Sequence, residues 1–200
     1  MATPQTKSPS HPADVSQLPL RRFAVDEYFA MAEAGILKRE ERVELIDGVI
    51  VEMAPIGNNH LGTTDLYNML LVRGVGDRAI VRVQGSILLA ESSMPEPDLV
   101  LLRARQDFYR YRTAVPDDVL LLIEVADSSV DYDRHQKLPR YAQAGIPEVW
   151  ITVLPERIIE AHAEPVAGRY TRNRIYTPGD TISPACFPDI ALPVSAIIPG

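Results

Sequence analysis

Two carboxylates occur where the sequence makes a carboxylate energetically unfavourable. Glu124 interrupts the apolar run Val119–Val125, and Asp98 comes directly after Pro97 at the start of the apolar segment Leu99–Leu102. Burying an unpaired ionised carboxylate is strongly unfavourable, so each of these acids needs a compensating partner. Hard divalent cations such as Mg²⁺ bind one or two carboxylates together with water and phosphate oxygens. The two acids therefore indicate a candidate metal site of the kind that hydrolyses phosphodiester bonds.

Structural explanations exist for the same acids, and the sequence leaves them open. Glu124 would also be stable in a core if it paired with an arginine or stayed protonated, and Asp98 would also serve to cap a turn. Glu44 interrupts another β-like segment, but the alternation of a strand would equally well point its side chain to solvent.

A positive charge near the scissile phosphate is the next requirement of such a site. The chain has three lysines, Lys7, Lys38 and Lys137. Only Lys137 closely follows the segment that contains Glu124, roughly two turns into a predicted helix, and its long stem could reach back to the end of a strand. The alternative is an ordinary exposed helical lysine.

A strand–helix–strand unit must position these side chains. Val119–Val125 has the length and nearly continuous apolar character of a strand buried on both faces. A helix is predicted over Asp131–Ala144, ended by Gly145 and Pro147, and Glu148–Leu154 is predicted as the following strand. Strand, helix and strand in this order predict a parallel crossover.

The first acid along the chain belongs to a predicted hairpin. Apolar residues recur at helical spacing over Val25–Ala34, and Gly35 ends this short helix. Val43–Ile46 and Val49–Met53 then flank Asp47–Gly48, a dipeptide that accepts the positive φ angles of a tight hairpin turn. The sequence therefore predicts a helix followed by a β-hairpin.

The remaining elements are weaker predictions. A helix is expected over His60–Val72, β-rich pieces at Ile80–Gln84 and Ile87–Leu89, and a strand at Asp98–Leu102. Residues 157–200 carry short β-like pieces separated by prolines, and we expect them to cover an edge of the sheet.

Composition and charge set the broad class. The 200 residues are 46% hydrophobic and 24% charged, as in a globular protein, and the net charge of −7 argues against a protein that coats nucleic acid electrostatically. A single cysteine, Cys186, cannot form an internal disulfide. The absence of a signal-like or membrane-spanning segment favours a cytoplasmic protein. Residues 1–19 are expected to form a flexible tail and residues 20–200 a single domain.

Several of these motifs together resemble a known nuclease family. Pro97–Asp98 and Glu124–Ala126 resemble the PD-(D/E)xK nuclease signature. The longer segments Glu124–Lys137 and Tyr141–Trp150 are similar to the large bacterial family of "putative restriction endonucleases". Glu44–Met53 and Pro95–Asp98 resemble other motifs of that family, and the resemblance covers residues from about Phe23 to Tyr170.

The resemblance implies a fold and an activity. The fold would be restriction-endonuclease-like α/β, with a central mixed β-sheet flanked by helices and an extra β-rich C-terminal segment. The activity would be cleavage of DNA that depends on Mg²⁺ or Mn²⁺, and the resemblance also implies a homodimer. Asp98 and Glu124 match the metal-binding acids, the carbonyl of Val125 would be a further ligand, and Glu44 matches an additional metal-binding and catalytic acid.

One position departs from the superfamily pattern. Ala126 stands where the pattern has its lysine, and the resemblance implies that a lysine on the following helix, Lys137, takes its place. Gln84, on the adjoining predicted strand, and His60, at the start of a predicted helix, are accessory candidates. Each has an ordinary structural explanation, a simple hydrogen bond for Gln84 and a helix-start position for His60.

Two other functions stay open. A non-catalytic nucleic-acid-binding or protein-interaction module on the same fold would explain Ala126 and the net negative charge, and it would bind without metal-dependent turnover. A hydrolase of small phosphoesters would lack affinity for DNA. Two arginine-rich runs could contact phosphates or form a solvated, salt-bridged surface. These runs contain Arg103, Arg105, Arg110, Arg112, Arg169, Arg172 and Arg174, and the first also contains Tyr109 and Tyr111.

Overall fold

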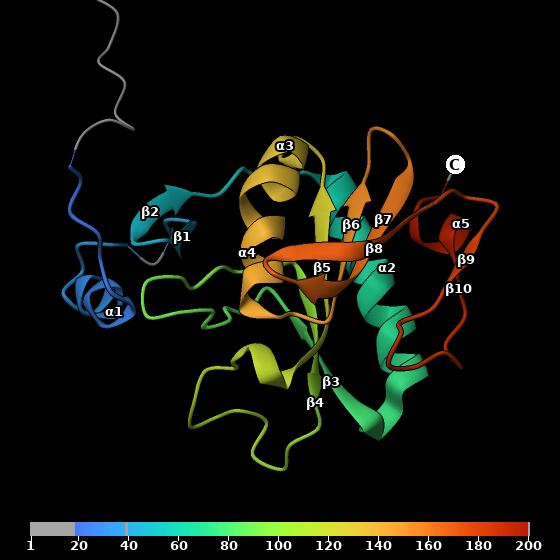
Figure 1. Ribbon diagram of the computed structural model, residues 1–200, viewed down its shortest axis with the longest axis horizontal. Helices are drawn as coiled ribbons and strands as arrows, with labels where there is room; N and C mark the ends of the chain where they lie inside the picture. The colour runs from blue at the N-terminus through green and yellow to red at the C-terminus, as the bar shows by residue number, and fades with distance from the viewer. Residues whose placement is uncertain (1–18, 39, 200) are drawn as a thin grey trace, which may run out of the picture.

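A six-stranded mixed sheet forms the centre of the computed structural model, which describes residues 19–38 and 40–199 (Figure 1). The predicted tail, apart from Pro19, lies outside the described residues. The sheet order is β3-β4-β5-β6-β7-β8, in which β5 and β6 run parallel and all other neighbours run antiparallel. The strands are β3 (Ala79–Val83), β4 (Leu99–Arg103), β5 (Val119–Ala126), β6 (Glu148–Val153), β7 (Ile158–Val166) and β8 (Arg169–Tyr176).

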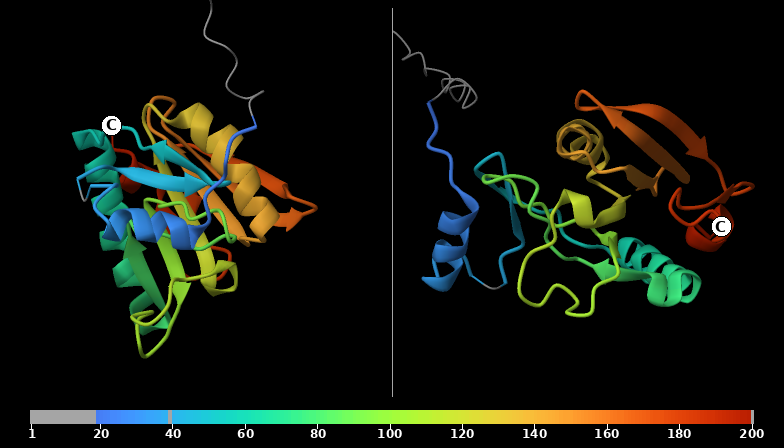
Figure 2. Two further views of the ribbon diagram at one scale, coloured as in Figure 1. Left: turned by 90° about the vertical axis from the view of Figure 1, so that its left-hand side faces the viewer. Right: turned by 60° about the horizontal axis from the view of Figure 1, so that its bottom comes forward.

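Helices cover both faces of this sheet, as Figures 1 and 2 show. On one face α2 (Asn58–Val75) buries Tyr67, Leu71 and Val75, which recur at helical spacing, and α5 (Val194–Ile197) lies beside it. On the other face α4 (Leu138–Ala144) packs over a second apolar cluster. The α2 helix confirms the predicted one and extends it at both ends.

Strand β5 shows why the buried acid faces the α4 side. Side chains alternate between the two faces of a strand. Ile123 and Val125 belong to the apolar cluster beneath α2, whereas Leu122 and Ala126 belong to the cluster beneath α4. Glu124 has the same parity as the second pair, so it is directed toward the helical segment that follows β5.

That helical segment lies where a helix was predicted, but it is not a regular α-helix. It consists of α3 (Val130–Tyr132), a π-helical turn η4 (Asp133–Lys137) and α4. Within it the Leu138 N–H bonds the carbonyl of Asp133, five residues earlier. The segment ends at Gly145, whose φ of 81° is left-handed, and β6 then pairs parallel with β5 as expected.

The N-terminal part forms a helix and a hairpin at one end of the molecule (Figure 2). These are α1 (Val25–Glu33), β1 (Val43–Ile46) and β2 (Val49–Glu52), and they confirm both predictions. In the turn Asp47 and Gly48 have φ values of 47° and 74°, as a two-residue hairpin requires. The hairpin is tied to the rest of the chain by the Met94 N–H, which donates to the Leu45 carbonyl at 2.7 Å.

Two of the weaker predictions need correction. The segment Ile87–Leu89 is not a strand, because its only pairing is an isolated bridge between Ile87 and Ala114. Its apolar pattern instead reflects burial, since Ile87 is fully buried. The C-terminal part adds two long strands, β7 and β8, to the sheet beyond β6, where short pieces were expected.

The smaller elements complete the described chain. They are two 3₁₀ turns, η2 (Gly76–Arg78) and η3 (Pro116–Asp118), and two short strands, β9 (Thr181–Ile182) and β10 (Leu192–Pro193). Across residues 19–38 and 40–199, no helix has the length and apolar character to cross a membrane.

Candidate active site

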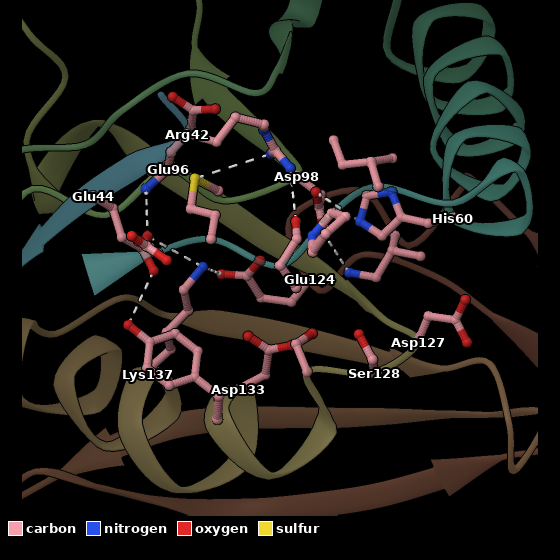
Figure 3. A pocket seen from close by; sticks show the side chains of 18 of the residues that line it. Arg42, Glu44, His60, Glu96, Asp98, Glu124, Asp127, Ser128, Asp133 and Lys137 are labelled. Carbon is pink, nitrogen blue, oxygen red and sulfur yellow. Dashed lines mark hydrogen bonds and ion pairs between the residues drawn. The ribbon is translucent and has the colours of Figure 1, made fainter. Parts of the chain in front are cut away.

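A cavity of about 450 Å³ lies where the start of β4 and the end of β5 meet the hairpin and the α3 segment. Figure 3 shows Arg42, Glu96 and Asp98 along one side of it and Asp127, Ser128 and Asp133 along the other, with Glu124 between them. The predicted site residues that line the cavity are Glu44, His60, Asp98, Glu124, Val125 and Lys137. Residues from five separate segments of the chain therefore converge here.

Glu124 is buried and held by two donors from the helical segment above it. Glu124 is 2% exposed. The Tyr141 hydroxyl donates to Oε1 at 2.6 Å, and Lys137 Nζ lies 3.3 Å from the same oxygen. Burial raises the pKa of this carboxyl, and the Lys137 charge opposes the rise. No donor among the described residues reaches Oε2, so that oxygen is available to a ligand.

Lys137 bridges two acids. Its Nζ lies 3.3 Å from Glu124 Oε1 and 3.3 Å from Glu44 Oε2, and its side chain is 6% exposed. Burial alone would lower the pKa of this lysine, but Glu124 and Glu44 outweigh it and raise the pKa above its usual value. The two acids therefore favour the ammonium form of Lys137, which can donate hydrogen bonds and supply charge.

The position of Ala126 explains how the lysine reaches the site from elsewhere. Ala126 faces the same side of β5 as Glu124, but its small side chain is fully buried in the cluster that contains Tyr141. Because the helical segment packs directly over this face, a long side chain from that segment occupies the space beside Glu124.

Asp98 is held at the edge of β5. Its Oδ2 accepts a hydrogen bond from the Val125 N–H at 2.8 Å, and its Oδ1 lies 3.0 Å from His60 Nε2. The N–H and C=O of one strand residue point to the same edge of the strand. The carbonyl of Val125 is therefore directed to the edge of β5 where Asp98 lies.

Glu44 is the most fully bonded of the acids. It is 2% exposed. Its oxygens accept hydrogen bonds from the Glu96 N–H at 3.0 Å and the Tyr132 hydroxyl at 3.1 Å, in addition to the Lys137 contact. Within the described part of the chain, no group of three or more His, Cys, Asp or Glu side chains is arranged to hold a metal ion. The oxygen donors that could bind a metal ion are the carboxylates of Asp98 and Glu124 and the Val125 carbonyl. This set suits Mg²⁺ when water or phosphate oxygens complete the coordination shell.

Comparison with known proteins identifies the family. The chain matches the Uma2 family, described as "Putative restriction endonuclease", over residues 25–195, which is more than half of its length. The chain belongs to the Uma2 family. The family resemblance expected from the sequence is thereby confirmed. No curated protein matches the chain.

A solved structure confirms the fold class. The Uma2 chain is similar to the crystal structure of a "putative nuclease belonging to DUF820" from Anabaena variabilis, with a TM-score of 0.71 and 12% sequence identity. The similarity covers 88% of this chain and 97% of that one. The predicted α/β fold, a central mixed sheet flanked by helices, is thereby confirmed.

Sequence reasoning missed several residues of the Uma2 chain that line the cavity. Asp133 is 4% exposed and accepts a hydrogen bond from the Ser129 hydroxyl at 2.6 Å. Burial is the main cause that raises its pKa to about 6. Arg42 and Tyr132 also line the cavity. The spacing of Asp133 and Lys137, four residues apart in a predicted helix, is a signal that could have identified the first of these.

Other candidates lie outside the cavity lining. The Gln84 N–H donates to the Asp98 carbonyl at 2.9 Å, but the Gln84 side chain does not line the cavity, and its Nε2 is buried without a partner among the described residues. None of the arginines of the two basic runs lines it either. In the first run Arg105 and Arg112 form ion pairs with Asp107 and Asp118. These pairs agree with a salt-bridged surface, which the sequence left open as the alternative to phosphate contacts.

Proposed function

We propose that this chain is a metal-dependent endonuclease that hydrolyses phosphodiester bonds of DNA. The observation that carries the proposal is the convergence of two buried carboxylates, Asp98 and Glu124, with the ammonium group of Lys137 in one cavity. Membership of the Uma2 family and the nuclease fold support the same class of reaction.

Mg²⁺ or Mn²⁺ is the proposed cofactor. Asp98, Glu124 and the Val125 carbonyl would hold it, because all three line one cavity and supply oxygen donors, and Glu44 lies close enough to add to the negative charge around it. Such an ion would supply the charge that polarises the scissile phosphate and activates a water molecule as the nucleophile.

The protein side chains would orient and neutralise the reacting groups. His60 and the Val125 N–H fix the Asp98 carboxylate, and Tyr141 fixes Glu124. Lys137, held in place by Glu44 and Glu124, would donate a hydrogen bond to a phosphate oxygen or to the attacking water as charge develops.

A non-catalytic binding module is the second candidate, and Ala126 is the observation that favours it. A site without a cation beside Glu124 would have little means of stabilising the transition state. The contact between Lys137 and Glu124 supports the nuclease over this alternative.

The homodimer and the cytoplasmic location stay predictions. The dimer is testable by light scattering of the purified protein, where a monomer at micromolar concentration would contradict it.

Cleavage of supercoiled plasmid and single-stranded DNA with Mg²⁺ or Mn²⁺ tests the proposal. We expect Asp98→Asn and Glu124→Gln to reduce cleavage by at least about a hundredfold, since each removes a charge from the metal site. Asp65→Asn, which changes an exposed acid on α2, is the matched control and should cleave as the unmodified protein does. Equal activity in all four proteins, or activity that survives EDTA, would overturn the assignment.

A further inference from the structure

One positively charged residue of the cavity lining is not paired with any of the lining acids. Of the lining residues, only Arg42, His60 and Lys137 can carry positive charge, and Lys137 is shared between two carboxylates. Within the described chain Arg42 forms no ion pair. The lining acids are Glu44, Glu52, Glu96, Asp98, Glu124, Asp127 and Asp133.

Arg42 is fixed against the segment that connects the hairpin to α2. Its Nη1 donates to the Ala54 carbonyl at 2.9 Å, and its Nη2 lies 4.0 Å from Met53 Sδ. A guanidinium group has five N–H donors in a rigid plane, so these two contacts leave donors free for an anion in the cavity. Figure 3 shows Arg42 on the same side of the cavity as Asp98.

The same connecting segment supplies an apolar wall. Met53, Ala54, Pro55 and Ile56 line the cavity next to the Arg42 guanidinium, whereas the α3 side contributes Asp127, Ser128 and Ser129. An apolar surface beside a phosphate-binding group suits a nucleobase, because enzymes that bind unpaired bases pack them against apolar or aromatic side chains.

The depth of the acids limits the form of the substrate. The side chains of Glu124 and Asp98 are only 3% and 11% exposed. A cavity of about 450 Å³ has the size of a small-molecule pocket and can admit a nucleotide, but a B-form duplex is a stiff rod that presents its phosphates on a broad outer surface. A phosphodiester approaches a metal ion held by these acids most easily where its strand is unpaired and flexible.

We propose that Arg42 and the segment Met53–Ile56 form a subsite for one unpaired nucleotide beside the scissile bond, so that the substrate is single-stranded DNA. Arg42 holds the phosphate that flanks the scissile one, and the apolar wall receives the base. This inference rests on the proposed function and names its substrate class.

Binding measurements test the subsite without turnover. Fluorescence anisotropy with Ca²⁺ in place of Mg²⁺ compares a labelled single strand with its duplex, and we expect the single strand to bind at least about tenfold more tightly. Arg42→Gln should weaken single-strand binding about tenfold, as loss of a charged hydrogen bond does. It should also lower the slope of log K against log salt by about 0.7, the value for one phosphate contact on a single strand.

Three further variants make the test specific. Arg42→Lys keeps the charge and should restore the salt slope. Ile56→Ala should weaken binding about threefold with an unchanged slope, because it removes apolar contact and no charge. Arg73→Gln, an exposed arginine of α2 outside the cavity, is the matched control and should bind as the unmodified protein does. Equal affinity for duplex and single strand, or an unchanged salt slope in Arg42→Gln, would overturn the subsite.

Cleavage of the same two substrates separates this inference from the proposed function. Equal Mg²⁺-dependent cleavage of duplex and single strand would support the nuclease and overturn the subsite. Single-strand binding that depends on Arg42, without cleavage of either substrate, would support the subsite and overturn the nuclease.

Discussion

Lys137 shows how strongly one residue can depend on its neighbours. The side chains of Glu44, Lys137 and Glu124 are 2%, 6% and 3% exposed, so none of the three charges is well solvated. A buried carboxylate that loses its partner keeps its desolvation penalty, and breaking such a pair destabilises proteins by about 3–5 kcal/mol. Lys137 is therefore expected to contribute to folding as well as to the proposed chemistry of the site.

We expect Lys137→Met to lower the free energy of unfolding by about 3 kcal/mol or more, because two buried acids then lose their shared cation. Equilibrium denaturation in urea measures this change. Lys38→Met alters an exposed lysine and should stay within about 0.5 kcal/mol of the unmodified protein.

The double variant Lys137→Met/Glu124→Gln isolates the electrostatic part of this loss. Since it removes one of the two buried carboxylate charges that have lost their cation, it should be more stable than Lys137→Met alone. A double variant as unstable as the single one would show that packing, and not charge, accounts for the loss.

His60 should act on the metal through Asp98. We expect His60→Ala to raise the Mg²⁺ concentration needed for half-maximal cleavage by about 10- to 100-fold, the usual effect of removing a residue that orients a metal ligand. His135→Ala changes an exposed histidine outside the cavity lining and serves as the control. An unchanged Mg²⁺ requirement, with cleavage reduced or not, would contradict this role.

At the scale of elements, the hairpin matters because it carries Glu44 to the site. Its turn depends on Gly48, where φ is 74° and an added Cβ would lie 2.6 Å from the Arg22 Cβ and 2.9 Å from the Phe23 nitrogen. The Gly48 N–H also donates to the Ser92 carbonyl at 2.6 Å. The turn is therefore packed closely against two other segments, and a side chain at this position has no space.

We expect Gly48→Ala to lower the free energy of unfolding by roughly 1–3 kcal/mol, because it introduces both backbone strain and overlap. Thermal or urea denaturation gives the value. Gly62→Ala, in the exposed interior of α2 with nothing within 4 Å of its added Cβ, should instead raise stability by up to about 1 kcal/mol. Equal effects of the two substitutions would refute the argument from the turn.

Local signals made the hairpin and the crossover predictable. Asp47–Gly48 needs no long-range information to form a turn, and the apolar run of β5 identifies a strand buried on both faces. The β7–β8 hairpin was less visible because β8 is an edge strand with mostly exposed residues, so it lacks an apolar pattern. At Ile87–Leu89 the apolar residues reflect burial in apolar clusters and not pairing in the sheet.

The site was predictable only where a residue type conflicted with its surroundings. Glu124 conflicts with an apolar strand, and Lys137 is one of only three lysines. Arg42 and Asp133 resemble ordinary surface charges in the sequence, because their roles come from segments that meet only in the folded chain.

For the whole molecule, the distribution of charge implies that the proposed DNA binding depends on a divalent cation. The net charge is −7, and the cavity is lined mostly by acids. Two arginines of the first basic run are paired with Asp107 and Asp118 at 2.8 and 2.6 Å. The acids that line the cavity outnumber its basic residues, so the cavity repels a polyanion until a divalent cation neutralises the acids.

We therefore expect Ca²⁺ to strengthen single-strand DNA binding by at least about tenfold relative to EDTA at matched ionic strength. Fluorescence anisotropy measures the change without cleavage. Asp98→Asn should lose most of this gain, whereas Asp65→Asn should keep it. Binding that is equally tight in EDTA would show that DNA is held elsewhere on the molecule.

The π-helical turn Asp133–Lys137 has a consequence for how this lysine should be found in related chains. A π turn amounts to one residue inserted into an α-helix, and one helical residue corresponds to a rotation of about 100°. In a relative without the inserted residue, a lysine at the same position in space would be separated from the acid equivalent to Glu124 by a different number of residues. Tyr141 follows Lys137 by one regular turn and bonds the same oxygen of Glu124, so an alignment should count back from this tyrosine.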